Sequence, residues 1–319
     1  MLSAGLALFG AIVYGAADFF GGLAAKRLRS IVVTAASAAS GLVFLTLLLP
    51  FVGGVWAPAD VAWGAVAGAF GVIAIALLYA CLAIGPMSIL SPLTAVVSAI
   101  APMLWGLLVN GETLSAIGYL GLGVALVAVV LVGFIPGERV VRPSARGLIM
   151  AVGAGLAIGA FLIAIDQTSS ESGLVPLVMT RATNMAITAV IIGTLVIRAL
   201  STGRRAASVL DVSGVAIGAT PSGHADLEHA VASSGAGVPA SRNRAWLLAI
   251  ICGVVDAAAN AIMLLALRIG DLSIVSALTA LYPAGTIILA AVVLKERVGA
   301  VQWAGLALAL IAGGMLALA

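Results

Sequence analysis

The sequence contains few charged residues: 8% of its 319 residues are Asp, Glu, Lys or Arg, whereas 63% are hydrophobic. Soluble domains are about 25% charged and about 45–50% apolar. A soluble fold of this length could not cover its surface with so few charges, which excludes a soluble enzyme, a disordered chain and a nucleic-acid-binding protein. The net charge of +3 lies mainly in the connections between apolar segments, where it relates to membrane orientation.

Cysteine and histidine are scarce as well. Cys81 and Cys252 both lie within apolar runs, which disfavours a disulfide framework. His224 and His229 share one polar segment, and no group of Cys and His residues has the spacing of a metal site. No Gly-x-x-x-x-Gly-Lys-Ser/Thr motif occurs, so ATP is not the expected energy source. We predict no cofactor, no metal site and no enzymatic activity.

Long apolar runs fill most of the chain. A helix needs about 20 apolar residues to cross the hydrocarbon core of a bilayer. The runs are continuous and do not alternate as the strands of a membrane barrel do, so their backbone groups must be paired within helices. The sequence therefore predicts an all-α integral membrane protein with ten transmembrane helices. The predicted helices cover residues 3–25, 31–53, 60–84, 87–109, 114–134, 146–165, 173–198, 245–267, 272–294 and 298–318.

An internal repeat relates the two halves of the chain. Residues 82–95 read LAIGPMSILSPLTA and residues 267–280 read LRIGDLSIVSALTA, with nine of fourteen positions identical. The similarity continues and pairs Glu112 with Glu296. Because each repeat contains five helices, an odd number, the two repeats must cross the membrane in opposite senses, as in many secondary transporters. We predict repeats at 1–137 and 138–319, with a polar insertion at 199–244.

Several motifs connect this pattern to a known family. They are the Ile-Gly-x-x-Ser turn after the third and eighth helices, Gly-Glu-Thr at 111–113, Lys-Glu-Arg at 295–297, and Tyr-Gly-Ala-Ala-Asp-Phe-Phe-Gly-Gly at 14–22. With them the chain resembles the EamA-type, ten-helix members of the drug/metabolite transporter superfamily. The resemblance implies a carrier that exports amino-acid-like metabolites or amphipathic drugs. The insertion at 199–244 departs from the short connection usual in that family.

The distribution of basic residues predicts an orientation. Lys and Arg favour cytoplasmic connections. Counted from the N-terminus, the odd-numbered connections are rich in them, whereas the even-numbered connections carry only Arg268. This pattern places both termini outside the cytoplasm, although the family resemblance favours the opposite. We expect a multi-pass protein of the plasma (inner) membrane, bacterial in origin.

Polar residues inside the predicted helices are candidates for a binding site, because a charge in mid-bilayer costs at least about 2.5–3.5 kcal/mol. Their repeat equivalents are apolar: Asp256 pairs with Gly71 and Arg181 with Ala38. This is the pattern expected of an asymmetric site on a symmetric frame. The predicted substrate-binding residues are Asp18, Tyr14, Arg181, Asn184, Asp256, Asn260, Tyr79, Trp105 and Tyr282.

These residues suggest how solute and protons could be handled. Arg181 would meet an anionic group, and Asp256 or Asp18 a cationic one. Both carboxyl groups are also the predicted proton-coupling residues, because a carboxyl group in a medium of low dielectric constant can load and release a proton. The alternative is an Asp–Arg pair that only holds helices together. For the aromatic residues the alternative is packing or interface anchoring.

Glu112 and Glu296 lie near the predicted starts of the fifth and tenth helices. A carboxylate there stabilises the free amides of the first turn, so we predict a capping role for both. Pro283 follows Tyr282 and is expected to break the ninth helix.

The leading functional hypothesis is a secondary transporter that moves a small organic solute by alternating access. Its partners are a small-molecule substrate and the lipid bilayer, with no nucleic acid, and we expect a monomer or a homodimer. A channel or a structural or receptor membrane protein is the second hypothesis, although no rings of pore-lining polar residues are evident. A lipid-acting membrane enzyme is the third, and it lacks a clustered set of catalytic residues.

Overall fold

The computed structural model describes residues 1–25, 27–84, 87–133, 144–203, 205–206, 241–293 and 299–319, and these residues contain helices and no β-strand. Most of the predicted insertion at 199–244 and the whole of Glu296 therefore lie outside the described residues. The helices are α1 (Leu2–Ala25), α2 (Ser30–Val52), α3 (Pro58–Ile84), α4 (Met87–Leu108), α5 (Ala116–Val132), α6 (Ala145–Asp166), α7 (Val175–Ser201), α9 (Arg242–Arg268), α10 (Leu272–Thr279), α11 (Tyr282–Val293) and α12 (Ala300–Ala317).

The ten predicted transmembrane helices are confirmed, each within three residues at either end, with α10 and α11 forming the ninth together. Within the described residues, eight segments are long and apolar enough to cross a membrane, and two shorter apolar helices cover Pro92–Leu108 and Ala116–Val132. Serine side chains begin three of the helices: the hydroxyl oxygens of Ser115, Ser144 and Ser241 each accept a hydrogen bond from the amide three residues later. The chain is a multi-pass, all-α membrane protein.

The ninth transmembrane segment breaks where the sequence predicts. Helix α10 ends at Thr279 and α11 begins at Tyr282. Pro283 has no N–H to donate to the carbonyl oxygen of Thr279, four residues earlier. The chain continues through tighter turns, in which the Leu281 amide bonds to the Leu278 carbonyl and the Ala284 amide to the Leu281 carbonyl.

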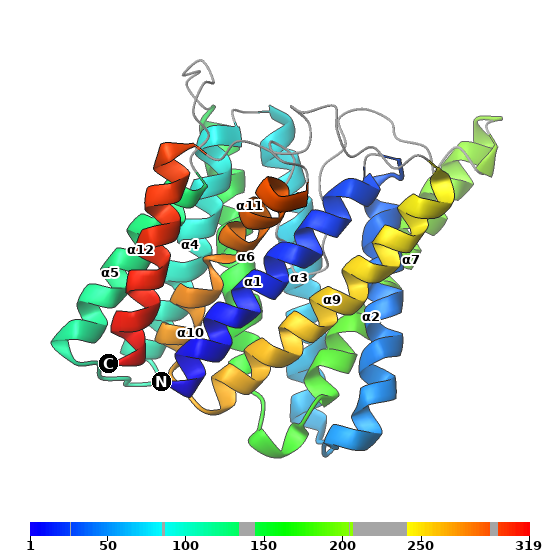
Figure 1. Ribbon diagram of the computed structural model, residues 1–319. Coiled ribbons are helices and arrows are strands. Elements are labelled where there is room, and N and C mark those ends of the chain that lie inside the picture. Colours follow the sequence, from blue (N-terminus) through cyan, green and yellow to red (C-terminus); the bar gives the residue numbers. More distant parts are fainter. Residues whose placement is uncertain (26, 85–86, 134–143, 204, 207–240, 294–298) are drawn as a thin grey trace.

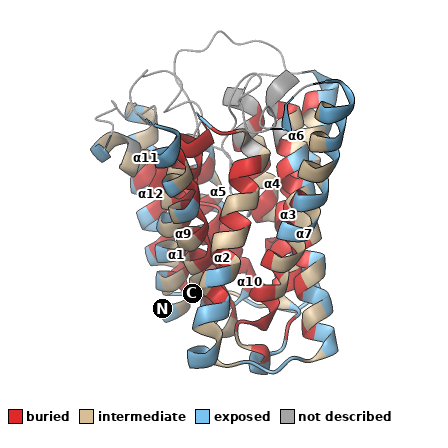
Figure 2. Cartoon of the chain, turned by 90° about the vertical axis from the view of Figure 1, so that its right-hand side faces the viewer, coloured by how far each residue is buried: buried red, intermediate tan, exposed pale blue. Residues whose placement is uncertain are grey.

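Eight of the transmembrane segments form a closed ring. Each one packs against the next in the order α1, α9, α2, α7, α3, α6, α4 and α10, and α10 with α11 packs back onto α1. Helices α5 and α12 pack against each other and touch this ring from outside through α4 and α1 (Figure 1). Buried residues concentrate on the faces that the helices turn toward one another (Figure 2). The interior of the ring is therefore the place where a buried polar group can be sheltered from lipid.

The two termini lie at the same end of the bundle (Figure 1). We call this end the terminal side. The even-numbered connections at residues 53–57, 109–115, 167–174 and 269–271 also lie there, because the chain crosses the bundle twice between one and the next.

Small residues bring neighbouring ring helices into close contact. A Cβ atom on Gly253 of α9 would lie 2.1 Å from the carbonyl oxygen of Ser37 on α2, and one on Gly68 of α3 would lie 2.7 Å from the carbonyl oxygen of Thr180 on α7. The Ser37 hydroxyl donates across the first interface to the Ala249 carbonyl at 3.0 Å, and the Thr180 hydroxyl donates across the second to the Gly64 carbonyl at 3.0 Å. The backbones at both interfaces approach too closely for any larger side chain.

Glu112 caps a helix, but not the one that the sequence suggested. Helix α5 begins at Ala116 behind its own cap, Ser115. The Glu112 carboxylate instead accepts hydrogen bonds from the amides of Leu272, at 2.8 Å, and Ser273, at 3.0 Å, in the first turn of α10. The local prediction was wrong because it considered only the nearest helix along the chain. The bond joins the α4–α5 connection to the other half of the protein.

We predict that Gly253→Ala destabilises the protein by about 1–3 kcal/mol, the usual cost of overpacking, because its methyl group would overlap the Ser37 carbonyl. Gly123→Ala is the control, since nothing lies within 4 Å of a Cβ at that position and alanine favours a helix over glycine. Thermal unfolding in detergent measures both. Equal unfolding temperatures for the two variants would contradict the close contact.

A second prediction concerns Asp271, which lies between α9 and α10. Partial burial and, secondly, the Glu112 carboxylate raise the pKa of Asp271 above its ordinary value of 3.8. The folded protein therefore holds this proton more tightly than the unfolded chain, so this contribution to stability is lost as pH rises through the raised pKa. We expect Asp271→Asn to stabilise the protein more at about pH 7 than at about pH 4. Unfolding temperatures at both values test this, with the exposed Glu171→Gln as the control.

Candidate functional site

The centre of the candidate site is a buried ion pair. Arg181 of α7 and Asp256 of α9 form a salt bridge, and their side chains are 2% and 0% exposed. Helices α7 and α9 are the two neighbours of α2 in the ring, so the pair passes over α2. Gly41 of α2 lets α9 approach closely here, because a Cβ there would lie 2.9 Å from the carbonyl oxygen of Gly253, and the same Cβ would be in ordinary contact with Cδ of Arg181, at 3.5 Å.

Two asparagines extend this ion pair along the same helices. The Asn260 amide donates to the Asp256 carbonyl at 2.8 Å and approaches the Asp256 carboxylate at 3.4 Å. Asn184 lies three residues after Arg181 on α7 and is 1% exposed. The structure thus brings four of the predicted site residues into the interface that α7, α9 and α2 share.

Asp18 and Tyr14 approach the same region from α1. The Tyr14 hydroxyl donates to the sulfur of Met263 on α9 at 3.4 Å, and Met263 lies three residues after Asn260. Asp18 is buried, with 2% of its surface exposed. The Cys252 thiol of α9 has Asp256, Asp18 and Arg181 as its charged neighbours. The charges of Asp18, Arg181 and Asp256, on three helices, therefore all act on Cys252, one turn before Asp256.

Tyr282 lies at the break between α10 and α11 and is 2% exposed. Its carbonyl oxygen lies 2.5 Å from the place that a Cβ on Gly15 would take. The Thr286 hydroxyl donates to the Gly15 carbonyl at 3.1 Å. The broken helix therefore packs tightly against α1, beside Tyr14.

The remaining two predicted residues are not brought to this cluster. Trp105, near the end of α4, has 37% of its surface exposed, and the side chain of Tyr79 lies outside the described part of the structure. Their roles remain predictions. Across the described residues, no three His, Cys, Asp or Glu side chains are grouped so that they could hold a metal ion.

Residues of α2 belong to the site, although the sequence analysis did not select them. Gly41 lies in contact with the Arg181 side chain, and the Ser37 hydroxyl donates to the Ala249 carbonyl of α9, three residues before Cys252. The repeat contained a usable signal, because Ala38 is the equivalent of Arg181 and lies between these two residues. Equivalent helices of an inverted repeat commonly face each other across the binding site.

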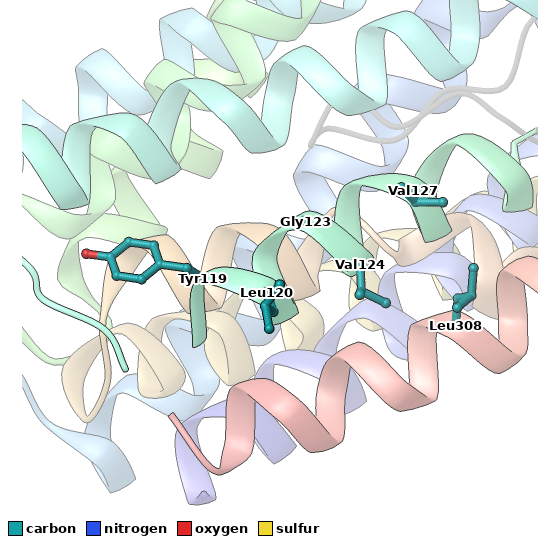
Figure 3. Close-up of a pocket in the computed structure, with 6 residues that line it drawn as sticks. All are labelled: Tyr119, Leu120, Gly123, Val124, Val127 and Leu308. Atoms are coloured by element: carbon teal, nitrogen blue, oxygen red, sulfur yellow. The ribbon is translucent and has the colours of Figure 1, made fainter. Parts of the chain in front are cut away.

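The grooves on the outer surface have a different character from the buried cluster. One lies between α5 and α12 and is lined by Tyr119, Leu120, Gly123, Val124, Val127 and Leu308 (Figure 3). A second is lined by Val96, Leu126, Val127, Val130 and Leu131. These side chains are almost wholly apolar, as expected of a surface in contact with lipid, and none of the predicted site residues is among them.

Comparison with known proteins agrees with this architecture. The model of the EamA-like transporter family matches residues 232–318, which contain α9 to α12. The matched segment is thus similar to the EamA-like transporter family. The prediction of an EamA-type protein of the drug/metabolite transporter superfamily is thereby confirmed, and this superfamily consists of membrane transporters.

The fold similarity extends beyond the matched segment. A solved structure titled "Crystal structure of protein" is similar to this chain with a TM-score of 0.65 and 15% sequence identity, over 97% of this chain and 98% of the other. At this identity the similarity concerns the fold alone. No curated protein matches the sequence significantly.

We predict that Arg181 and Asp256 are strongly coupled in stability. Asp256→Asn or Arg181→Gln leaves one buried charge without its partner, which typically costs about 3–5 kcal/mol. The double variant leaves neither charge and should lose less than the sum of the two single losses. Unfolding of the four proteins in detergent completes the cycle. Additive losses would show that the two side chains do not interact.

Proposed function

We propose that this EamA-type protein is a secondary transporter that moves a small organic solute by alternating access. One observation carries the proposal: Asp18, Arg181 and Asp256 are buried together, on three different helices of the ring. Charges inside a membrane are costly and are kept mainly for substrate or ion handling. A pair that served only to hold α7 and α9 together would have no need of Asp18.

The charges of the site favour a solute with a cationic group. Two buried carboxyl groups accompany one guanidinium. An amino group of the solute would pair with a carboxylate, and a carboxylate of the solute would compete with Asp256 for Arg181, which offers planar, bidentate recognition. Amino-acid-like zwitterions therefore fit best, and cationic amphiphiles are second. Export is the direction that the family resemblance implies.

Proton coupling follows from the same count of charges. If Arg181 remains with Asp256, then Asp18 is the carboxyl group that exchanges a proton for a cationic solute. If the solute displaces Asp256 from Arg181, Asp256 can take the proton. A pH gradient can drive transport in both cases. Substitution of Asp18 would abolish proton coupling in the first case, and substitution of Asp256 would abolish it in the second.

The two-repeat organisation, 1–137 and 138–319, belongs to this proposal because the binding site of such carriers lies between the repeats. The packing partners support it. Helix α1 packs on α9 as α6 packs on α3, and α2 packs on α9 as α7 packs on α3. In each comparison, replacing both helices of the first contact by their equivalents in the other repeat gives the second contact. We further propose a bacterial plasma membrane location with both termini outside, as a monomer or homodimer.

The test is counterflow of labelled solute in proteoliposomes, after a thermal-shift screen of amino acids, sugars, nucleosides and cationic drugs has found a ligand. We expect unlabelled solute on the far side to accelerate uptake. Asp18→Asn should lower pH-driven transport at least tenfold and weaken binding of a cationic ligand, while Arg244→Gln, at an exposed site on the opposite side, should behave as the wild type. Uptake that unlabelled solute does not accelerate would indicate a pore and contradict the carrier.

A further inference from the structure

Arg268 is the exception to the charge pattern, since it is the one basic residue of the even-numbered connections. It ends α9 on the terminal side, and its guanidinium donates to three oxygens of the α6–α7 connection. One nitrogen donates to the Thr168 carbonyl, and the other donates to the Thr168 hydroxyl at 2.6 Å and the Ser172 hydroxyl at 3.1 Å. Thr168 and Ser172 are 4% and 0% exposed, and Arg268 is half-buried, so these bonds are partly shielded from solvent.

These bonds cross the mouth of the ring. Going round the ring, α9 and α6 are separated by three helices on either side, which makes them opposite members. Thr168 follows the end of α6 by two residues. Helices α6 and α9 also contact each other directly, so a bond from the end of α9 to the end of α6 holds opposite members of the ring together at its terminal-side mouth.

Asp60 holds the same connection from a third direction. It lies in the first turn of α3 and is 3% exposed, and its carboxylate accepts hydrogen bonds from both the amide and the hydroxyl of Ser169, each at 2.7 Å. The Val55 amide donates to the Glu171 carbonyl at 2.9 Å. Residues 168–172 are thus joined to α9 by Arg268 and to α3 by Asp60.

The arrangement is specific to one end of the bundle. In the repeat, the equivalent of Arg268 is Ala83, which cannot donate a side-chain hydrogen bond. Arg268 also has Asp60 and Asp166 as its charged neighbours. The terminal side therefore carries a charged network that the sequence does not repeat at the equivalent position of the opposite side.

We propose that Arg268, Asp60 and residues 168–172 form a latch that closes the terminal side, and that its release opens the site to that side. The inference rests on the proposed alternating-access function. Asp256 precedes Arg268 by twelve residues on α9, about 18 Å along one helix. A movement of α9 that opens the latch therefore also displaces the partner of Arg181, so binding at the site and opening of the mouth are linked.

Cys252 provides a reporter for the test. It lies one turn from Asp256 and is 0% exposed, and Cys81→Ala leaves it as the single thiol of the chain. The protein is reconstituted into vesicles selected for outward exposure of a C-terminal tag, so that the terminal side faces outward. A membrane-impermeant maleimide is then added outside. The rate of Cys252 labelling measures how often the terminal side opens.

We expect Arg268→Gln to increase the labelling rate about tenfold or more, since hydrogen bonds from a charged donor are among the stronger ones. Arg244→Gln, at the other end of the same helix and exposed, should leave it unchanged. Ser169→Ala removes one of the two bonds to Asp60 and should give a smaller increase. It also serves as the test if Arg268→Gln does not fold, as judged by gel filtration.

The outcomes separate the latch from the transport function, because labelling requires no solute. Faster labelling without counterflow of any solute would support the latch and contradict the carrier. Unchanged labelling in each variant that folds, or an equal increase in Arg244→Gln, would overturn the latch even if counterflow is normal.

Discussion

The ion pair between Arg181 and Asp256 is the interaction on which the interior of this protein depends. A single charge at this depth would be held at a high cost in free energy. Each of these two side chains offsets the cost of burying the other by pairing with its opposite charge. Their meeting requires α7 and α9 to be held at a fixed separation on either side of α2. The close contact between α2 and α9 at Gly253, and the absence of a side chain at Gly41, provide that geometry. The small residues of the ring thus set the position of its charges.

The proposed repeats make the frame nearly symmetric, whereas its chemistry is not. Helix contacts in one half have counterparts in the other, but the charged pair has Ala38 and Gly71 as repeat equivalents, and Arg268 has Ala83. A symmetric frame can adopt two arrangements of similar energy, one open to each side. Polar groups placed on one repeat alone make these arrangements unequal. Asymmetric charges can therefore give such a carrier a preferred resting state.

The fold could be predicted almost completely from the sequence, because the length of an apolar run is set by the thickness of a bilayer and leaves little choice of structure. The break in the ninth segment followed from Pro283, which lacks a donor. The site was predicted only as a set of residues. Which of them meet depends on the order of helices round the ring, and no run length or motif encodes that order. Gly41 was missed because its role appears only once α7 and α9 are placed on either side of α2.

Glu112 and Arg268 show the same limit at the ends of the helices. The sequence analysis assigned Glu112 to the cap of the next helix along the chain, and it gave Arg268 only a place in the count of basic residues. Both instead bind groups far away in sequence, at α10 and at the α6–α7 connection. Long polar side chains reach across connections, so their partners are determined by tertiary structure.

The break between α10 and α11 has a mechanical consequence. A continuous helix transmits tilt from one membrane face to the other as a rigid rod, whereas a rod with a joint at mid-depth does not. Here the Glu112 carboxylate binds the first turn of α10, and the Thr286 hydroxyl joins α11 to α1. In the proposed alternating-access cycle, the joint at residues 280–281 would let α10 and α11 change tilt separately, so that one face of the membrane could rearrange while the other stays sealed.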